Sequence, residues 1–206
     1  MAVVIERKLR RERAPKVRGV LLVYPLLQLA HFRLPSYRTY VPYQLLSLLR
    51  EETLTQTVNF YLNTTFTEDE LFNNRHLSLD DYEKFYSRVN VTMPEEFRLA
   101  SSFPSTPHPD TAKLFDASVS PLLAADEILL ESPSTLIVAC TYDVLQSDAQ
   151  LYYHRLTNLR VKDVLYKEYP IFHGAMTFVD FPVAFTEAFQ IVYETAQFVV
   201  NRTSYL

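Results

Sequence analysis

The stretch that decides the fold begins P-S-T-L-I-V-A-C-T-Y-D-V-L-Q-S-D at residues 133–148 and ends V-K-D-V-L-Y-K-E-Y-P-I-F-H-G-A at residues 161–175. Each part contains an apolar run that predicts a buried β-strand, over residues 135–141 in the first and 161–169 in the second. The segment between them has helical spacing. The order strand, helix, strand therefore predicts an α/β fold with two neighbouring parallel strands.

Each of these two strand patterns leads to a polar residue that a buried strand does not need. The first ends at Asp143, and the second leads through Tyr169 and Pro170 to His173. The carboxyl ends of parallel strands meet at one edge of a sheet, where functional sites form. There Asp143 could accept the Nδ1–H of His173, fix its tautomer and stabilise the imidazolium. The alternative is a turn aspartate and, separately, a packed loop histidine.

The rest of the chain contains one further strand pattern and several helices. A near-continuous apolar run predicts a buried strand over 17–24, and the helical pattern of residues 1–13 ends before Pro15. Irregular structure is predicted for residues 29–42 and for the Pro-rich segment 91–121. Further helices are predicted over residues 44–63, within 69–90, over 147–159 and over 185–200.

Helical spacing also predicts which residues face the core. In the first helix Met1, Ile5 and Leu9 share one apolar stripe. In the last helix the predicted inward residues are Phe189, Val192, Tyr193, Ala196, Val199 and Val200. Ser147 with Gln150 predicts a capping box, to which Asp148 adds a negative charge in the first turn.

Composition excludes several classes of function. A formal charge of −4 predicts no general attraction to nucleic acid. The single cysteine, Cys140, lies in an apolar run and reads as a core residue, so no disulfide and no cysteine-based metal site is expected. Only two glycines occur, Gly19 and Gly174, so the chain contains no Gly-rich phosphate loop and no G-x-S-x-G motif.

Several segments resemble one protein family. S-P-L-L-A at 120–124, Y-D-V-L-Q-S-D at 142–148 and Y-P-I-F-H-G at 169–174 are similar to motifs of the hormone-sensitive-lipase-like branch of the α/β-hydrolases. The arylacetamide deacetylases are the members that they resemble most. V-R-G-V-L-L-V-Y-P-L-L-Q at 17–28 resembles another strand of that fold, and the likeness covers nearly the whole chain.

This resemblance implies a serine ester or amide hydrolase in which Asp143 and His173 are the acid and the base. It implies a small-molecule or lipid ester substrate, and neither a metal nor an organic cofactor. Family members also carry an H-G-G-G oxyanion loop and a G-D-S-A-G-G nucleophile elbow, and this sequence contains neither. Residues 1–5 resemble the helix that directly follows the elbow.

We therefore expect residues 1–206 to form a single partial domain, the C-terminal portion of an α/β-hydrolase fold. Parallel strands with flanking helices should be present, and the first half of the sheet absent. The chain as given should be inactive, because it lacks the nucleophile. An alternative is a non-catalytic binding or regulatory protein that keeps the remnant of the fold.

Two observations suggest where in the cell the protein is located. Sequons at Asn63, Asn90 and Asn201 give weak evidence for a luminal environment. The resemblance points to the luminal side of the endoplasmic reticulum, where family members are held by an N-terminal membrane anchor. That anchor is not found in this sequence, so membrane attachment is expected only through a missing segment.

Overall fold

A computed structural model describes residues 2–12, 17–41, 49–98, 103–104, 106–180 and 185–203. Its centre is a parallel sheet of three strands: β1 (Gly19–Val23), β2 (Ser134–Tyr142) and β3 (Val164–Phe172). The strands lie side by side in the order β1, β2, β3. The predicted class, parallel strands with flanking helices, is confirmed.

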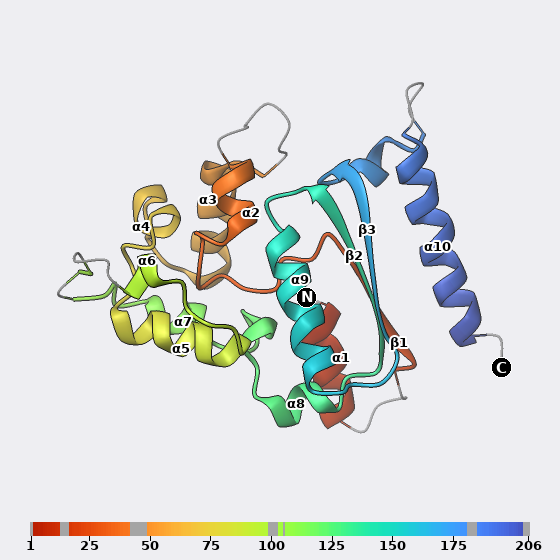
Figure 1. Ribbon diagram of the computed structural model, residues 1–206, viewed down its shortest axis with the longest axis horizontal. Coiled ribbons are helices and arrows are strands. Elements are labelled where there is room, and N and C mark those ends of the chain that lie inside the picture. The colour runs from red at the N-terminus through yellow and green to blue at the C-terminus, as the bar shows by residue number, and fades with distance from the viewer. Residues whose placement is uncertain are drawn as a thin grey trace.

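Helices cover both faces of this sheet (Figure 1). The helices α1 (Ala2–Arg11) and α9 (Gln146–Asn158) lie on one face, and α10 (Thr186–Thr203) lies on the other. β2 is buried on both sides because its side chains alternate between two cores. Ile137 and Ala139 pack on the α9 side, whereas Val138 and Cys140 pack on the α10 side.

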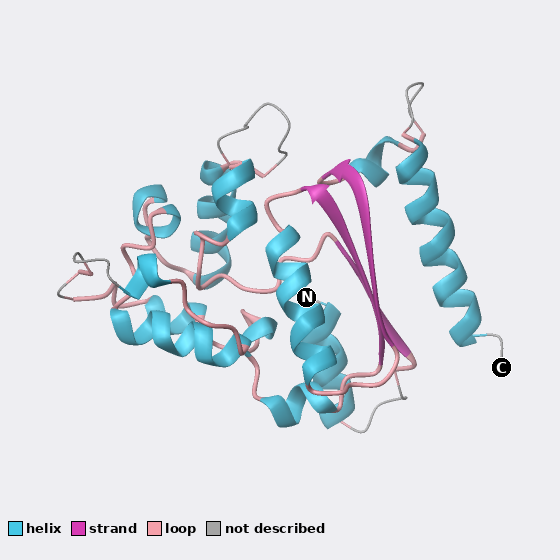
Figure 2. Ribbon diagram, in the orientation of Figure 1, coloured by secondary structure: helices cyan, strands magenta, loops and turns pink. Residues whose placement is uncertain are grey.

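A group of short helices lies beyond α9, away from the sheet (Figure 2). These are α2 (Pro35–Tyr40), α3 (Glu51–Leu62), α4 (Glu68–Phe72), α5 (Leu79–Val89), α6 (Glu95–Arg98) and α7 (Thr111–Leu114). The 3-10 helix η1 (Pro121–Leu123) and α8 (Asp126–Leu130) lead back to β2, and the 3-10 helix η2 (Ala175–Phe178) follows β3. No helix in the described ranges is long and apolar enough to cross a membrane.

Local chemistry sets the ends of these short helices. Capping boxes begin α4 and α5, built from Thr67 with Glu70 and from Ser78 with Asp81. Asn63 ends α3 and Asn90 ends α5, both in the left-handed backbone region that asparagine tolerates.

Several boundaries differ from those expected. Residues 29–42 are not all irregular, because Pro35 starts α2 and the helix buries Tyr37. β3 begins at Val164 rather than at 161, because Arg160 and Asp163 have left-handed φ of 59° and form a turn. The helix expected from residue 44 runs from Glu51, and residues 42–48 lie outside the described ranges.

The capping box expected at Ser147 is wrong. α9 begins at Gln146 and its N-cap position is Leu145, with no side-chain cap. The Ser147 hydroxyl instead accepts the backbone N–H of Ser36, 3.1 Å away in α2. The hydroxyl oxygen that was expected to cap the helix therefore accepts a hydrogen bond from a distant segment instead.

In α1, Val3 is buried, whereas Ile5 on the predicted apolar stripe is 48% exposed. The inward face predicted for the last helix is wrong. In α10 the buried residues are Ala188, Ile191, Thr195 and Phe198, and Phe189, Val192, Tyr193, Val199 and Val200 are exposed. α10 has apolar side chains on two stripes, so periodicity cannot choose between them. The face with small Ala188 and Thr195 lies against the sheet, where a close approach is needed.

Candidate active site

The ends of β2 and β3 bring Asp143 and His173 together. Tyr142 pairs with Phe172 in the sheet register, so the next residue of each strand emerges at the same edge. The Oδ2 atom of Asp143 lies 2.8 Å from Nδ1 of His173. Two residues that are 30 positions apart in sequence thus form a direct contact, as the strand pattern predicts.

The geometry of this contact selects one tautomer of the histidine. The Asp143 side chain is buried, with 1% of its surface exposed, and its Oδ1 accepts the Leu145 N–H at 2.9 Å. A carboxylate has no proton to donate, so Nδ1–H of His173 is the donor. Nε2 is then left with its lone pair and can accept a proton. The His173 side chain is 20% exposed, so it can be reached from solvent.

The backbone next to His173 needs a glycine. Gly174 has a φ of 77°, in the left-handed region that a residue with a Cβ adopts only with strain. The turn at Gly174 directs the chain from the end of β3 into η2. It thereby presents His173 at the edge of the sheet instead of continuing the strand.

The turn that carries Asp143 is held from the β3 side by Glu168. One carboxylate oxygen of Glu168 accepts Gln146 Nε2 at 2.9 Å and the Thr141 hydroxyl at 3.1 Å. The other accepts the Tyr166 hydroxyl at 2.5 Å and Gln150 Nε2 at 3.4 Å. These bonds join β2, β3 and the first turns of α9 around the position of Asp143.

The same turn is held from the α2 side by a pair of serines. Ser147 N–H donates to Ser36 Oγ at 3.0 Å, and Ser36 N–H donates to Ser147 Oγ at 3.1 Å. The Ser36 hydroxyl also donates to the Val144 carbonyl at 2.5 Å. α2 is thus attached directly to the segment that follows Asp143.

Asp148 is a second carboxylate of this region and is completely buried. Its Oδ2 accepts the backbone N–H of Leu27 at 3.0 Å and of Gln28 at 3.2 Å. Its Oδ1 accepts Gln28 Nε2 at 3.0 Å and the Tyr37 hydroxyl at 3.3 Å. Sequence reasoning treated Asp148 only as a first-turn charge, because nothing in the local pattern reveals donors more than a hundred residues away.

Burial of Asp148 predicts a pH-dependent stability. Burial raises the pKa of this carboxyl to about 7 from its ordinary 3.8, and the hydrogen bonds that it accepts offset part of the rise. Between these two values the folded chain binds a proton that the unfolded chain does not. The contribution of Asp148 to the free energy of unfolding therefore falls as pH rises from about 4 to about 7, by roughly 1.4 kcal/mol per pH unit at most.

Urea unfolding of the wild type and of Asp148→Asn at pH 5, 6, 7 and 8 measures this dependence. The wild type should lose stability relative to the variant across this range, and the difference should level off above pH 7. Parallel pH profiles would contradict the assignment, since they would mean that Asp148 titrates alike in the folded and unfolded chains.

Tyr24, which sequence reasoning did not select, lies against the histidine. Its ring centroid is 5.3 Å from that of His173, and its hydroxyl oxygen accepts the Met176 N–H at 3.2 Å. The signal that could have indicated it is its place as the last residue of the strand predicted over 17–24, at the same sheet edge as Asp143 and His173.

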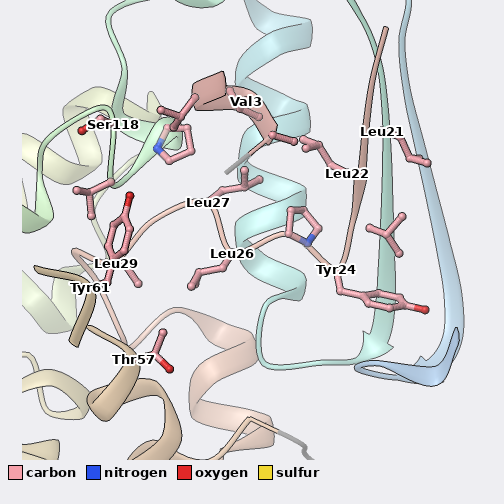
Figure 3. Close-up of a pocket in the computed structure, with 16 residues that line it drawn as sticks. Val3, Leu21, Leu22, Tyr24, Leu26, Leu27, Leu29, Thr57, Tyr61 and Ser118 are labelled. Carbon is pink, nitrogen blue, oxygen red and sulfur yellow. The ribbon is translucent and has the colours of Figure 1, made fainter. Parts of the chain in front are cut away.

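A cavity of about 400 Å³ lies beside β1 and the first turn of α1 (Figure 3). Its lining is mostly apolar and includes Val3, Leu22, Leu27 and Leu29. Tyr24, whose ring contacts His173, is also among the residues that line this cavity.

No family model matches the chain, but comparison with known proteins finds relatives. Human "Arylacetamide deacetylase-like 4" is 29% identical over 190 residues, which is 87% of this chain and 46% of that protein. Bovine "Arylacetamide deacetylase" is 30% identical over 86% of this chain and 46% of its own length. Rat "Neutral cholesterol ester hydrolase 1" is 30% identical over 80% and 42%, respectively.

Solved structures show the same fold. An esterase from Pyrobaculum calidifontis matches 95% of this chain and 47% of its own, with a TM-score of 0.61 at 17% identity. An esterase from Rhizomucor miehei matches 97% of this chain and 46% of its own, with a TM-score of 0.58 at 16% identity. The chain therefore spans about half the length of the proteins that it matches. By sequence and fold together, it is a homologue of the arylacetamide deacetylase-like esterases and carries part of an α/β-hydrolase fold.

Proposed function

We propose that this chain carries the acid–histidine half of a serine ester or amide hydrolase, within a single partial α/β-hydrolase domain. His173 would act as general base and then as general acid, and Asp143 would orient it and stabilise its imidazolium form. The observation that carries the proposal is the 2.8 Å contact between Asp143 and His173 at the ends of adjacent strands.

The reaction also needs a nucleophile and donors for the oxyanion. Neither a G-x-S-x-G nor an H-G-G-G motif occurs in the sequence. Without a nucleophile beside it, Nε2 of His173 has no hydroxyl to deprotonate. Loss of one oxyanion donor alone lowers the rate roughly 10²–10³-fold. We infer that the chain as given does not hydrolyse esters, and that the substrate of a complete protein is a small-molecule or lipid ester or amide.

Hydrolysis of p-nitrophenyl butyrate by the purified chain tests this inference. The wild type is expected to release no more p-nitrophenol than His173→Ala at equal concentration, after a cooperative thermal transition has shown that both are folded. Saturable turnover that His173→Ala abolishes would contradict the inactive assignment, because it would require a nucleophile within these residues.

A second candidate function is non-catalytic ligand binding. The apolar cavity beside Tyr24 favours it, since about 400 Å³ is within the range of small-molecule sites. Hydrolysis and ligand binding differ in what they require of His173. Ligand binding needs no proton transfer, so ligand affinity would be retained in His173→Ala.

The proposal includes a luminal setting in the endoplasmic reticulum. Support comes from three sequon asparagines, Asn63, Asn90 and Asn201, all of which are exposed. Asn63 and Asn90 also end helices in the left-handed conformation. This conformation is by itself a structural reason for asparagine at these two positions.

A further inference from the structure

Tyr24 has a backbone conformation that is unusual for an aromatic residue. Its φ is 50°, in the left-handed region, where a Cβ crowds the following carbonyl and costs free energy. Its N–H still donates to the Val138 carbonyl at 2.9 Å, so the residue continues the contacts of β1 with β2. Such strain persists only where surrounding contacts hold the residue in place.

Those contacts are made by the side chain of Tyr24, with His173 and with the segment that follows it. The ring packs against the imidazole with centroids 5.3 Å apart and an interplanar angle of 56°. The hydroxyl oxygen accepts the N–H of Met176, in the 3-10 helix that begins after Gly174. One side chain therefore contacts both the histidine ring and the segment that leaves it.

Burial keeps this phenol neutral. Desolvation raises the pKa of Tyr24 above its ordinary value of 10, and the negative charge of Asp143 acts in the same direction. A neutral hydroxyl can accept the Met176 N–H and places no charge beside the imidazole. Tyr24 thus acts on His173 directly through the packing of its ring, and indirectly through its hydrogen bond with Met176.

We propose that Tyr24 is a positioning residue, which holds the His173 ring in the plane where Nδ1–H meets Asp143. This inference rests on the proposed function of the Asp143–His173 pair and names a residue that fixes its geometry. Tyr24 is also among the residues that line the apolar cavity, with Leu22, Leu26 and Leu27 (Figure 3).

The Nδ1–H signal of His173 reports this positioning without any catalytic turnover. It can be observed by NMR in the full chain labelled with ¹⁵N-histidine, and assigned by its loss in His173→Gln. In Tyr24→Leu the proton should exchange with water about tenfold faster, since an aromatic contact to the ring is lost. In Tyr24→Phe, which keeps the ring but removes the acceptor for Met176, exchange should be about threefold faster.

Tyr193→Leu is the matched control, because Tyr193 is 64% exposed on α10 and away from the sheet edge. It should leave the exchange rate unchanged. If Tyr24→Leu loses its cooperative thermal transition, Tyr24→Phe decides the question alone. Exchange within about twofold of wild type in every folded Tyr24 variant overturns the inference. A wild-type signal that Asp143→Asn does not alter would instead overturn the Asp143–His173 pair, and with it the role of Tyr24.

Discussion

Replacing Asp148 with alanine is expected to lower the free energy of unfolding by about 3–5 kcal/mol. The carboxylate is fully buried and accepts four hydrogen bonds, from Leu27, from the backbone and side chain of Gln28, and from Tyr37. Each buried donor that loses its acceptor costs about 1–3 kcal/mol, and water entering the space recovers part of this. The loss would also detach the segment after β1 from α9.

Urea unfolding at pH 7, followed by circular dichroism, measures this change. Glu83→Ala is the matched control, because Glu83 is an exposed carboxylate within α5, and its stability should stay within about 0.5 kcal/mol of wild type. A loss below about 1 kcal/mol for Asp148→Ala would mean that the four donors find other acceptors, and the proposed anchoring role would be wrong.

Asp143→Asn is expected to lower ester hydrolysis strongly when this chain is joined to a protein segment that supplies a nucleophile. A suitable hybrid replaces the matched 46% of bovine arylacetamide deacetylase with residues of this chain. If Asp143 and His173 act as proposed, Asp143→Asn should lower kcat about 10⁴-fold, because the amide can donate to Nδ1 and then stabilises the wrong tautomer. KM should change far less, since neither residue is expected to bind the acyl group.

Initial rates of p-nitrophenyl butyrate hydrolysis by the hybrid give both constants. His173→Ala should be equally impaired, and the double variant no worse than either single variant, since the two residues act as a unit. Asp80→Asn, an exposed aspartate in the first turn of α5, should leave kcat unchanged. A hybrid that turns over normally with asparagine at position 143 would show that another residue orients the histidine.

Much of the sheet could be predicted from sequence, because a central parallel strand has a distinctive pattern. The run from Leu136 to Cys140 is apolar at every position, and every side chain in it is buried. The end of β3 differs from the predicted residue 169, because the strand continues through Pro170, which a strand tolerates at a position where its nitrogen is not required as a donor. That extension places the strand end next to His173.

Helix faces and side-chain partners could not be predicted in the same way. α10 has two apolar stripes, and the sheet packs against the one that contains Ala188, Ile191 and Phe198. Ser147 has the sequence features of a helix cap but bonds to Ser36. In each case local periodicity allows more than one arrangement, and contact with a distant segment selects among them.

The amino-acid sequence alone predicts the parallel α/β class and the two residues, Asp143 and His173, that directly follow adjacent strands. These follow from local rules, since apolar runs bury strands and chain order makes the strands neighbours. The surroundings of the pair depend on the folded chain as a whole: Tyr24 packs against the imidazole, and Asp148 joins α9 to the segment after β1. Such contacts join residues more than a hundred positions apart, and the energy of desolvating a ring or a carboxylate depends on the whole surrounding packing.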